Sequence, residues 1–335
     1  MASSSQVETS GSARKLKRLA FAIVAFVLIY TAGWFYGAAQ LKDLLLGRMV
    51  EAEAGAFSVS CPGLETRGFP FRIGVFCDSV GMDDRSSGAS ASFGALRSAA
   101  QVYRPGHAII ELDGPAEFRV SPYLSVTADW SLLHASAVAW LDGLQRGSLS
   151  YDGLNGRLNA PARGVSAGFA ARHGEAHVRQ NGEALDVALS ADGLSLSMVQ
   201  ALLPAFDIAA DITFADAARW ISKEGPPENP LRGSRGELRR LSIDIGNGRT
   251  AALSGPFSIN DEGALSGQFD LDMRGIDVWR DAIISAFPDT ARTVRNIAAT
   301  VKALSGNGQD AVVKLNVNDG TVYLGMIPIA FLEPF

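Results

Sequence analysis

Two histidines and a carboxylate lie close together in the run His173-Gly174-Glu175-Ala176-His177. In a β-strand, residues 173, 175 and 177 share one face, and two imidazoles with a carboxylate are ligands that zinc accepts. However, Gly174 disfavours the helix on which an HExxH-type site depends, and the segment is typical of a solvated hairpin. No further ligand is indicated. We therefore expect polar surface residues here, with neither a metal site nor a cofactor.

Other patterns that could support catalysis are weaker. Serine is abundant, but no G-x-S-x-G elbow opens a helix. Gly-Asn-Gly at 246–248 and 306–308 lacks the lysine of a phosphate-binding loop. Asp83 and Asp84 lie in polar loop sequence, and their spacing alone does not make them an acid–base pair. We expect a protein that is not an enzyme; the remote alternative is a hydrolase whose site the spacing does not reveal.

Cys61 and Cys77 are the two cysteines of the chain, and they flank a stretch that is typical of a turn and a strand. A disulfide between them would contribute roughly 3 kcal/mol by loop closure and would persist in an oxidising compartment. We predict this disulfide; the alternative is two buried free thiols. The spacing is not the C-x-x-C of redox catalysis or zinc binding.

Two segments carry more apolar surface than a loop or a chain end needs. Gly68-Phe69-Pro70-Phe71-Arg72 is an extended ribbon fixed by proline, whose rings require burial or a partner. We predict a partner or lipid contact through Phe69, Pro70, Phe71 and Arg72. Residues 320–335 are unusually apolar, and exposed apolar patches of that size are rare. They predict a last strand with a docked tail; the alternative is a contact with lipid or a partner.

A membrane anchor is the strongest prediction. Leu19 to Tyr36 contains no charged residue, and a helix continued to Ala39 is about 30 Å long, the thickness of a hydrocarbon core. Four cations precede this run, which by the positive-inside rule keeps residues 1–18 cytoplasmic and exports the rest. The aromatic residues at 34–36 suit the outer interface. We predict a transmembrane helix over 19–39. The alternatives are a signal peptide cleaved after Gly37-Ala38-Ala39 and a buried soluble helix.

Charge excludes nucleic acid as a partner. The formal net charge is −5, and the first 18 residues contribute four cations and one glutamate, or +3, so the remainder carries −8. That remainder has no basic stripe interleaved with aromatic residues, which is the usual footprint of a nucleic-acid-binding protein.

The elements that must position these residues are mainly strands. Residues 40–55 continue as a helical stalk, and then a period of two dominates, as in 206–214, 265–273 and 311–317. Turn signals separate the runs: Asp113-Gly114, Asp152-Gly153, Asn181-Gly182, Asn247-Gly248, Glu262-Gly263 and Asp319-Gly320. We predict a mainly β (α+β) fold, with a long, curved antiparallel meander over 56–335 preceded by one transmembrane helix.

A few helices interrupt the predicted meander. They are expected over Ser195–Leu203, Ala215–Lys223 and Val278–Leu304, the last broken near Phe287-Pro288 because proline disrupts a helix interior. The proline-rich stretch at 225–232 marks the place where the β-rich domain would divide into two sub-lobes.

The chain resembles the alphaproteobacterial family catalogued as domain of unknown function 2125. The resemblance rests on the N-terminal anchor and on motifs in a fixed order: GFPFR at 68–72, YRP at 103–105, DGP at 113–115, GPF at 255–257, LSG at 265–267 and the segment 319–325. It implies a protein attached to the inner membrane of Gram-negative bacteria and facing the periplasm, and it brings no catalytic residues. The strand style is also similar to AsmA-type envelope proteins, whose sheets curl into apolar grooves for lipid.

These observations favour a non-enzymatic envelope binding module at the bacterial inner membrane, with its N-terminus cytoplasmic and its main domain periplasmic. An apolar groove in the sheet would take lipid or acyl chains. The alternative is an envelope structural or assembly factor that acts through contacts with another envelope protein.

Overall fold

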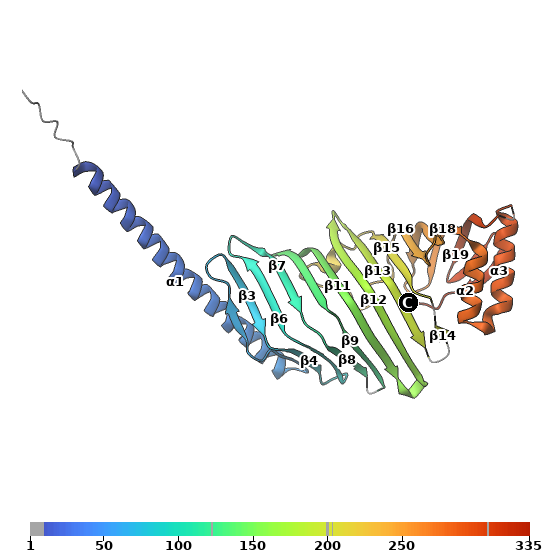
Figure 1. Cartoon of the computed structure of the whole chain (residues 1–335), viewed down its shortest axis with the longest axis horizontal. Coiled ribbons are helices and arrows are strands. Elements are labelled where there is room, and N and C mark those ends of the chain that lie inside the picture. The colour runs from blue at the N-terminus through green and yellow to red at the C-terminus, as the bar shows by residue number, and fades with distance from the viewer. Residues whose placement is uncertain (1–9, 122, 199–200, 203, 307) are drawn as a thin grey trace, which may run out of the picture.

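The computed structural model describes residues 10–121, 123–198, 201–202, 204–306 and 308–335, and the fold is mainly β, as predicted. A long antiparallel sheet follows an apolar N-terminal helix (Figure 1). The described helices are α1 (Ser10–Ala54), α2 (Ile276–Ala286) and α3 (Ala291–Leu304), with 3₁₀ turns η1 (Pro161–Arg163), η2 (Ala218–Ile221) and η3 (Pro288–Thr290).

Helix α1 is continuous from the apolar run into the residues of the predicted stalk. It contains no proline, and it ends where Gly55 begins the turn into the first strand, with Gly55 N donating to Ala52 O at 3.0 Å. Ala13–Ala54 is long and apolar enough to cross a membrane. The first part of α1 stands clear of the sheet, whereas its last turns lie beside the first strands (Figure 1).

In the first half of the sheet, each long strand consists of two segments in line. β3 pairs with β6 while the following β4 pairs with β5, and β7 pairs with β6 and β10 while the following β8 pairs with β5 and β9. The segments are β1 (Phe57–Ser60), β2 (Glu65–Arg67), β3 (Arg72–Cys77), β4 (Val80–Asp84), β5 (Ala89–Phe93), β6 (Leu96–Gln101), β7 (Arg104–Leu112), β8 (Ala116–Ser121), β9 (Leu124–Asp129) and β10 (Leu132–Trp140).

The short breaks between two segments in line, such as that between β7 and β8, lie side by side on neighbouring strands. Together they form a crease across the sheet. Asp113, which follows β7, accepts a hydrogen bond from Gly94 N (3.0 Å) and donates one to Ala95 O (2.9 Å) in the neighbouring break. At the next break, Ser131 N donates to Asp152 O at 3.0 Å. Asp113-Gly114 was predicted to be a hairpin turn, and this is wrong: the chain bends there and then continues in line as β8.

The crease continues as bulges through unbroken strands. β11 (Gly143–Ala160) pairs with β10 before Gly153 and with β9 after it, and Gly153 adopts φ 63°. In β13, Gly193 adopts φ 61°. Positive φ is nearly free for glycine alone, so glycine permits a strand to bend at these places. The predicted turn at Asp152-Gly153 is therefore wrong as well.

The second half of the sheet is an antiparallel meander of strands joined by short turns, except where residues 215–234 and helices α2 and α3 intervene. The predicted turns at Asn181-Gly182, Asn247-Gly248, Glu262-Gly263 and Asp319-Gly320 are confirmed. The strands are β12 (Val165–Asn181), β13 (Ala184–Met198), β14 (Ala201–Leu202), β15 (Phe206–Phe214), β16 (Arg235–Asp244), β17 (Thr250–Ile259), β18 (Leu265–Arg274), β19 (Asp310–Asn318), β20 (Thr321–Leu324) and β21 (Ile327–Phe331).

The helix predictions have mixed outcomes. The break of Val278–Leu304 near Phe287-Pro288 is confirmed, since α2 ends and α3 begins around it. Ala215–Lys223 forms only the short turn η2. The helix over Ser195–Leu203 is wrong: Ser195–Met198 extend β13, because Leu196 pairs with Phe169 of β12, and residues 199, 200 and 203 lie outside the described residues.

The apolar C-terminal segment forms β21 and a docked tail, as predicted. Leu332 N donates to Gly320 O at 2.8 Å, and Phe335 N donates to Gly263 O at 3.0 Å.

Candidate functional site

One face of the sheet carries an unbroken row of apolar residues. Residues directly opposite each other on neighbouring strands point to the same face, and strands lie about 4.8 Å apart, so a row across ten strands spans roughly 40 Å. This apolar row consists of Ile110, Ala135, Leu149, Ala176, Leu189, Ala210, Leu241, Leu253, Leu271 and Val313.

A second row beside it is also apolar. It consists of Ile73, Ala100, Ala108, Ala137, Gly147, Val178, Val187, Ile212 and Leu238. The two rows together define the apolar face. The opposite, polar face carries residues that alternate with them along the strands, such as Ser150, Glu175, Ser190, Ser242 and Asp272.

The crease folds the sheet toward its apolar face. Val80 and Phe93 come from one side of the crease, Cys77 and Leu96 from the other, and all four pack in one cluster with Leu64. The crease therefore brings residues from its two sides together on the apolar face. Below, the trough denotes this apolar face between the Leu64 cluster and helices α2 and α3.

Helix α1 and the disulfide close the first end of the trough. Leu45 of α1 packs against the cluster of Leu64, Cys77 and Val80. The predicted Cys61–Cys77 pair lies at disulfide distance, with the two Cα atoms 5.2 Å apart. The bond ties the turn that precedes β2 to the end of β3.

Helices α2 and α3 cover the far end. Ile276 and Val301 pack on Val313 and Leu324, with exposed fractions of 7% or less. Between the helices and the sheet lies an apolar cavity of about 160 Å³, lined in part by Leu271, Met273 and Trp279. The indole Nε1 of Trp279 is buried and has no hydrogen-bond partner among the described residues. A cavity of this size holds a ligand no larger than benzene, so it suits the end of a longer molecule.

A strap, residues 215–234, crosses the strand ends along one side of the trough. Trp220 packs on Phe214 with ring centroids 5.1 Å apart. Ala218 N donates to Glu183 O (2.9 Å), and Lys223 N donates to Asp142 O (3.0 Å) in the β10–β11 turn. The strap therefore connects the end of β15 to the turns before β11 and β13, and its Trp220 ring covers Phe214.

Away from the strap and the end clusters, no second layer covers the apolar face within the described ranges. Leu149, Val178 and Ile212 are only half-buried, and Leu189 is 48% exposed. A two-layer domain would bury such a face in its core, whereas here the middle of the row stays partly exposed.

The Phe69–Arg72 segment, predicted to contact a partner or lipid, lies against α1. The Phe69 ring contacts the rings of Trp34 and Phe35, with centroids 5.5 Å and 5.6 Å away. The Phe71 side chain is 68% exposed.

The His173–Glu175–His177 cluster lies on the polar face and is solvent-exposed. His173 Nδ1 is 2.7 Å from Asp152 Oδ1, and His177 Nε2 is 3.0 Å from Glu175 Oε2. The hydrogen bond with Asp152, helped by Glu175, raises the pKa of His173, and the hydrogen bond with His177 lowers the pKa of Glu175. Within the described residues, no three His, Cys, Asp or Glu side chains are placed to hold a metal ion.

One serine does match the G-x-S-x-G pattern, in Gly164-Val165-Ser166-Ala167-Gly168. Ser166 lies at the start of β12, and its hydroxyl donates to Asn159 Oδ1 at 3.0 Å. A nucleophile elbow needs a strand-to-helix turn, whereas here a turn leads into a strand. The geometry of a serine nucleophile is therefore not met.

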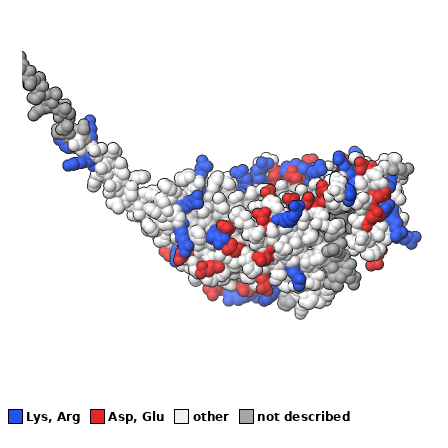
Figure 2. Space-filling model, in the orientation of Figure 1, with Lys and Arg blue, Asp and Glu red and all other residues white. Residues whose placement is uncertain are grey.

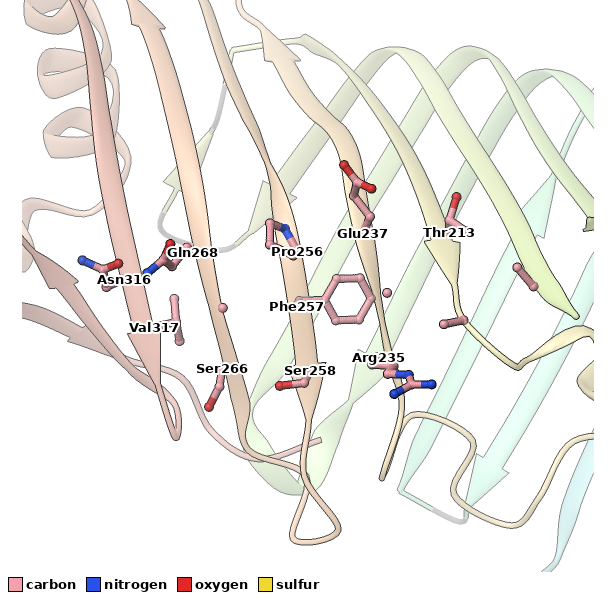
Figure 3. Close-up of a pocket in the computed structure, with 14 residues that line it drawn as sticks. Thr213, Arg235, Glu237, Pro256, Phe257, Ser258, Ser266, Gln268, Asn316 and Val317 are labelled. Carbon is pink, nitrogen blue, oxygen red and sulfur yellow. The ribbon is translucent and has the colours of Figure 1, made fainter.

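A broad depression of about 970 Å³ lies over β15 to β19 near the strap. Figure 3 shows Glu237 and Arg235 apart from each other, with Phe257 drawn between them. Arg235 Nη2 binds Asp216 Oδ2 at 2.7 Å, so its charge is already paired. The lining brings no acid and base together.

The family model described as "Uncharacterized protein conserved in bacteria (DUF2125)" matches residues 34–333. The chain belongs to this family. No curated protein and no solved structure matches it. The match covers the sheet, the end clusters and the last turns of α1, so the trough lies within the family's common region.

Sequence reasoning identified the strands and predicted an apolar groove, but it could not name the residues that would line one. The alternation in 206–214 and 265–273 showed that these strands have an apolar face, but only the register places ten such strands in one row. In the sequence, the proline-rich stretch after Trp220 was the one sign of the strap, and nothing indicated the contact that Trp220 makes.

Proposed function

We propose that α1 anchors the protein in the bacterial inner membrane, with its N-terminus cytoplasmic and the sheet in the periplasm. Cationic side chains cluster at the start of α1, and uncharged surface follows up to the sheet (Figure 2). The charge asymmetry supports this orientation. The Cys61–Cys77 pair supports an oxidising compartment.

The sheet, in this proposal, is a non-enzymatic module that shelters acyl chains in its trough. One observation carries it: the apolar row runs from Ile110 to Val313 without a polar residue, and no second layer of described residues lies over its middle. Burying apolar surface contributes about 25 cal/mol per Å², so an acyl chain lying along the row is stabilised at each methylene. The cavity beneath α2 and α3 takes the chain end.

Adjacent residues of β13 provide a matched test. Leu189 points into the trough, and Ser190 points to the polar face. A photo-crosslinking amino acid would be placed at either position in the full chain in living cells, and adducts identified by mass spectrometry. We expect acyl-lipid adducts at 189 and a loss of them at 190. Equal lipid labelling at both positions, or none at 189, contradicts the proposal.

A second candidate is an assembly factor that contacts another envelope protein, and the sheet edge favours it. The last strand, β21, pairs only with β20 among the described strands, and Ile327 and Phe331 on it are 54% and 61% exposed. Exposed edge strands pair readily with other chains. The same crosslinker at Phe331 would give a defined protein adduct if this role is the main one.

A further inference from the structure

Two turns of the sheet form one exposed aromatic tip. The Gly68–Arg72 turn joins β2 to β3, and the turn at Val102 and Tyr103 joins β6 to β7. Val102 N donates to Phe71 O at 3.1 Å, which holds the turns together. Phe71 and Tyr103 are each 68% exposed, and Val102 is 37% exposed.

Helix α1 holds this tip from the side. Tyr30 Oη donates to Pro70 O, and Trp34 Nε1 donates to Arg72 O at 2.9 Å. Trp34 and Ala38 are 8% and 4% exposed, so the sheet covers this side of the helix. The tip is therefore fixed at the level of residues 30 to 34.

When α1 spans a bilayer, residues 30 to 34, which hold the tip, lie within its hydrocarbon core. Tyr30 follows the last cation, Arg18, by twelve residues, which is about 18 Å of helix. A hydrocarbon core is about 30 Å thick, so a core that begins at Arg18 extends about 12 Å beyond Tyr30. Any tilt of the helix makes the tip deeper.

Four backbone carbonyls of the Gly68–Arg72 turn are already hydrogen-bonded within the protein. Unpaired carbonyls are costly in lipid, yet the carbonyls of Gly68, Pro70, Phe71 and Arg72 all accept hydrogen bonds, from Arg72 N, Tyr30, Val102 N and Trp34. Arg72 and Arg104 have exposed side chains at the base of the tip. Arginines beside inserted rings suit the phosphates of lipid headgroups.

We propose that Phe71, Val102 and Tyr103 form a tip that inserts into the periplasmic leaflet beside α1, with Arg72 and Arg104 at its headgroups. This rests on the membrane anchor of the proposed function but not on acyl-chain binding. The occupant of the tip surface is the bilayer, because the tip is hydrogen-bonded to the spanning helix itself. The sheet is then held at a fixed angle and height and does not swing on a flexible stalk.

Fluorescence quenching by brominated lipid tests the insertion. An environment-sensitive fluorescent amino acid would be placed at Phe71 or Tyr103 of the full chain, in vesicles of phosphatidylethanolamine and phosphatidylglycerol. The control is Val312, an apolar residue of β19 that is 73% exposed and far from α1. We expect blue-shifted emission at 71 and 103 and loss of most of it with brominated chains, with position 312 unchanged.

A reporter at Ile23 separates the two ways of failing. Quenching at 23 without quenching at 71 and 103 leaves the anchor in place and overturns the tip. No quenching at 23 overturns the anchor and the tip together. Neither result bears on the crosslinks at Leu189, which test the acyl-chain trough by itself.

Discussion

Replacing Asp186 by asparagine tests whether one buried charge holds the middle of the sheet together. Asp186 is 6% exposed in β13. It accepts hydrogen bonds from Arg179 (2.7 Å), Thr213 (2.9 Å) and Arg239 (3.1 Å), side chains of β12, β15 and β16. Burial alone would raise the pKa of Asp186, but these hydrogen bonds outweigh it and lower the pKa to about 2. The carboxylate therefore links four strands behind the trough.

The free energy that the Asp186 charge contributes follows from the shift of its pKa. A shift from 3.8 to about 2 corresponds to about 2 kcal/mol at 1.36 kcal/mol per unit. The Asp186→Asn change should therefore speed amide hydrogen exchange of β12 and β13 by roughly 30-fold at pH 7, if exchange follows local opening. The matched control is Asp272→Asn: this exposed carboxylate of β18 has no hydrogen bond in the described structure, so its exchange should not change.

The stabilisation by the Asp186 carboxylate should depend on pH in a defined direction. A lowered pKa in the folded state stabilises the protein above the unfolded pKa, and that contribution is lost as the pH falls through the folded value. The difference between wild type and Asp186→Asn should be full at pH 7 and should shrink from about pH 4 toward pH 2. Equal exchange in the two variants at pH 7, or a difference that stays constant down to pH 2, would refute the role of the charge.

Two further predictions concern the trough and the polar face. Replacing both Cys61 and Cys77 with serine should lower the free energy of unfolding by about 3 kcal/mol for a loop of this length. The loss should be measured as faster amide hydrogen exchange in β2 and β3, with α2 and α3 as the internal control. Unchanged exchange in β2 and β3 contradicts a stabilising bond. Asp152→Asn should lower the pKa of His173 measured by NMR, because the hydrogen bond with Asp152 is the main cause of its increase. That interaction stabilises the fold fully below the unfolded pKa and is lost as the pH rises through the folded pKa, and an unaltered titration would show that Asp152 is not the cause.

Local pattern was sufficient for much of the fold. The alternation over 206–214 corresponds to β15, and that over 265–273 to nearly all of β18. Proline near residue 288 separates α2 from α3 because it cannot donate a hydrogen bond within a helix. These features depend on neighbours in the sequence, and such neighbours are visible without a structure.

The wrong predictions of secondary structure fall where pairing with strands distant in the sequence determines the conformation. Asp113-Gly114 has the composition of a hairpin turn, but β8 pairs with β5 and β9, so the chain continues in line. Ser195–Met198 is short enough to suit a helix or a strand, and pairing of Leu196 with Phe169 selects the strand. The trough depends on the register of ten strands, which no local pattern states.

The second apolar row begins beside the tip, and its first residues are mostly small. The second apolar row begins at Ile73, next to Arg72 of the tip, and continues through Ala100, Ala108, Ala137 and Gly147. Small side chains leave room above the sheet that Val178 and Ile212 fill farther along. A lipid that entered the proposed trough beside the tip would thus meet these small side chains first. The Leu189 crosslinks should accordingly weaken when bulky residues replace Ala108 and Ala137, while equivalent substitutions at polar-face His107 and Ser136 should have no effect.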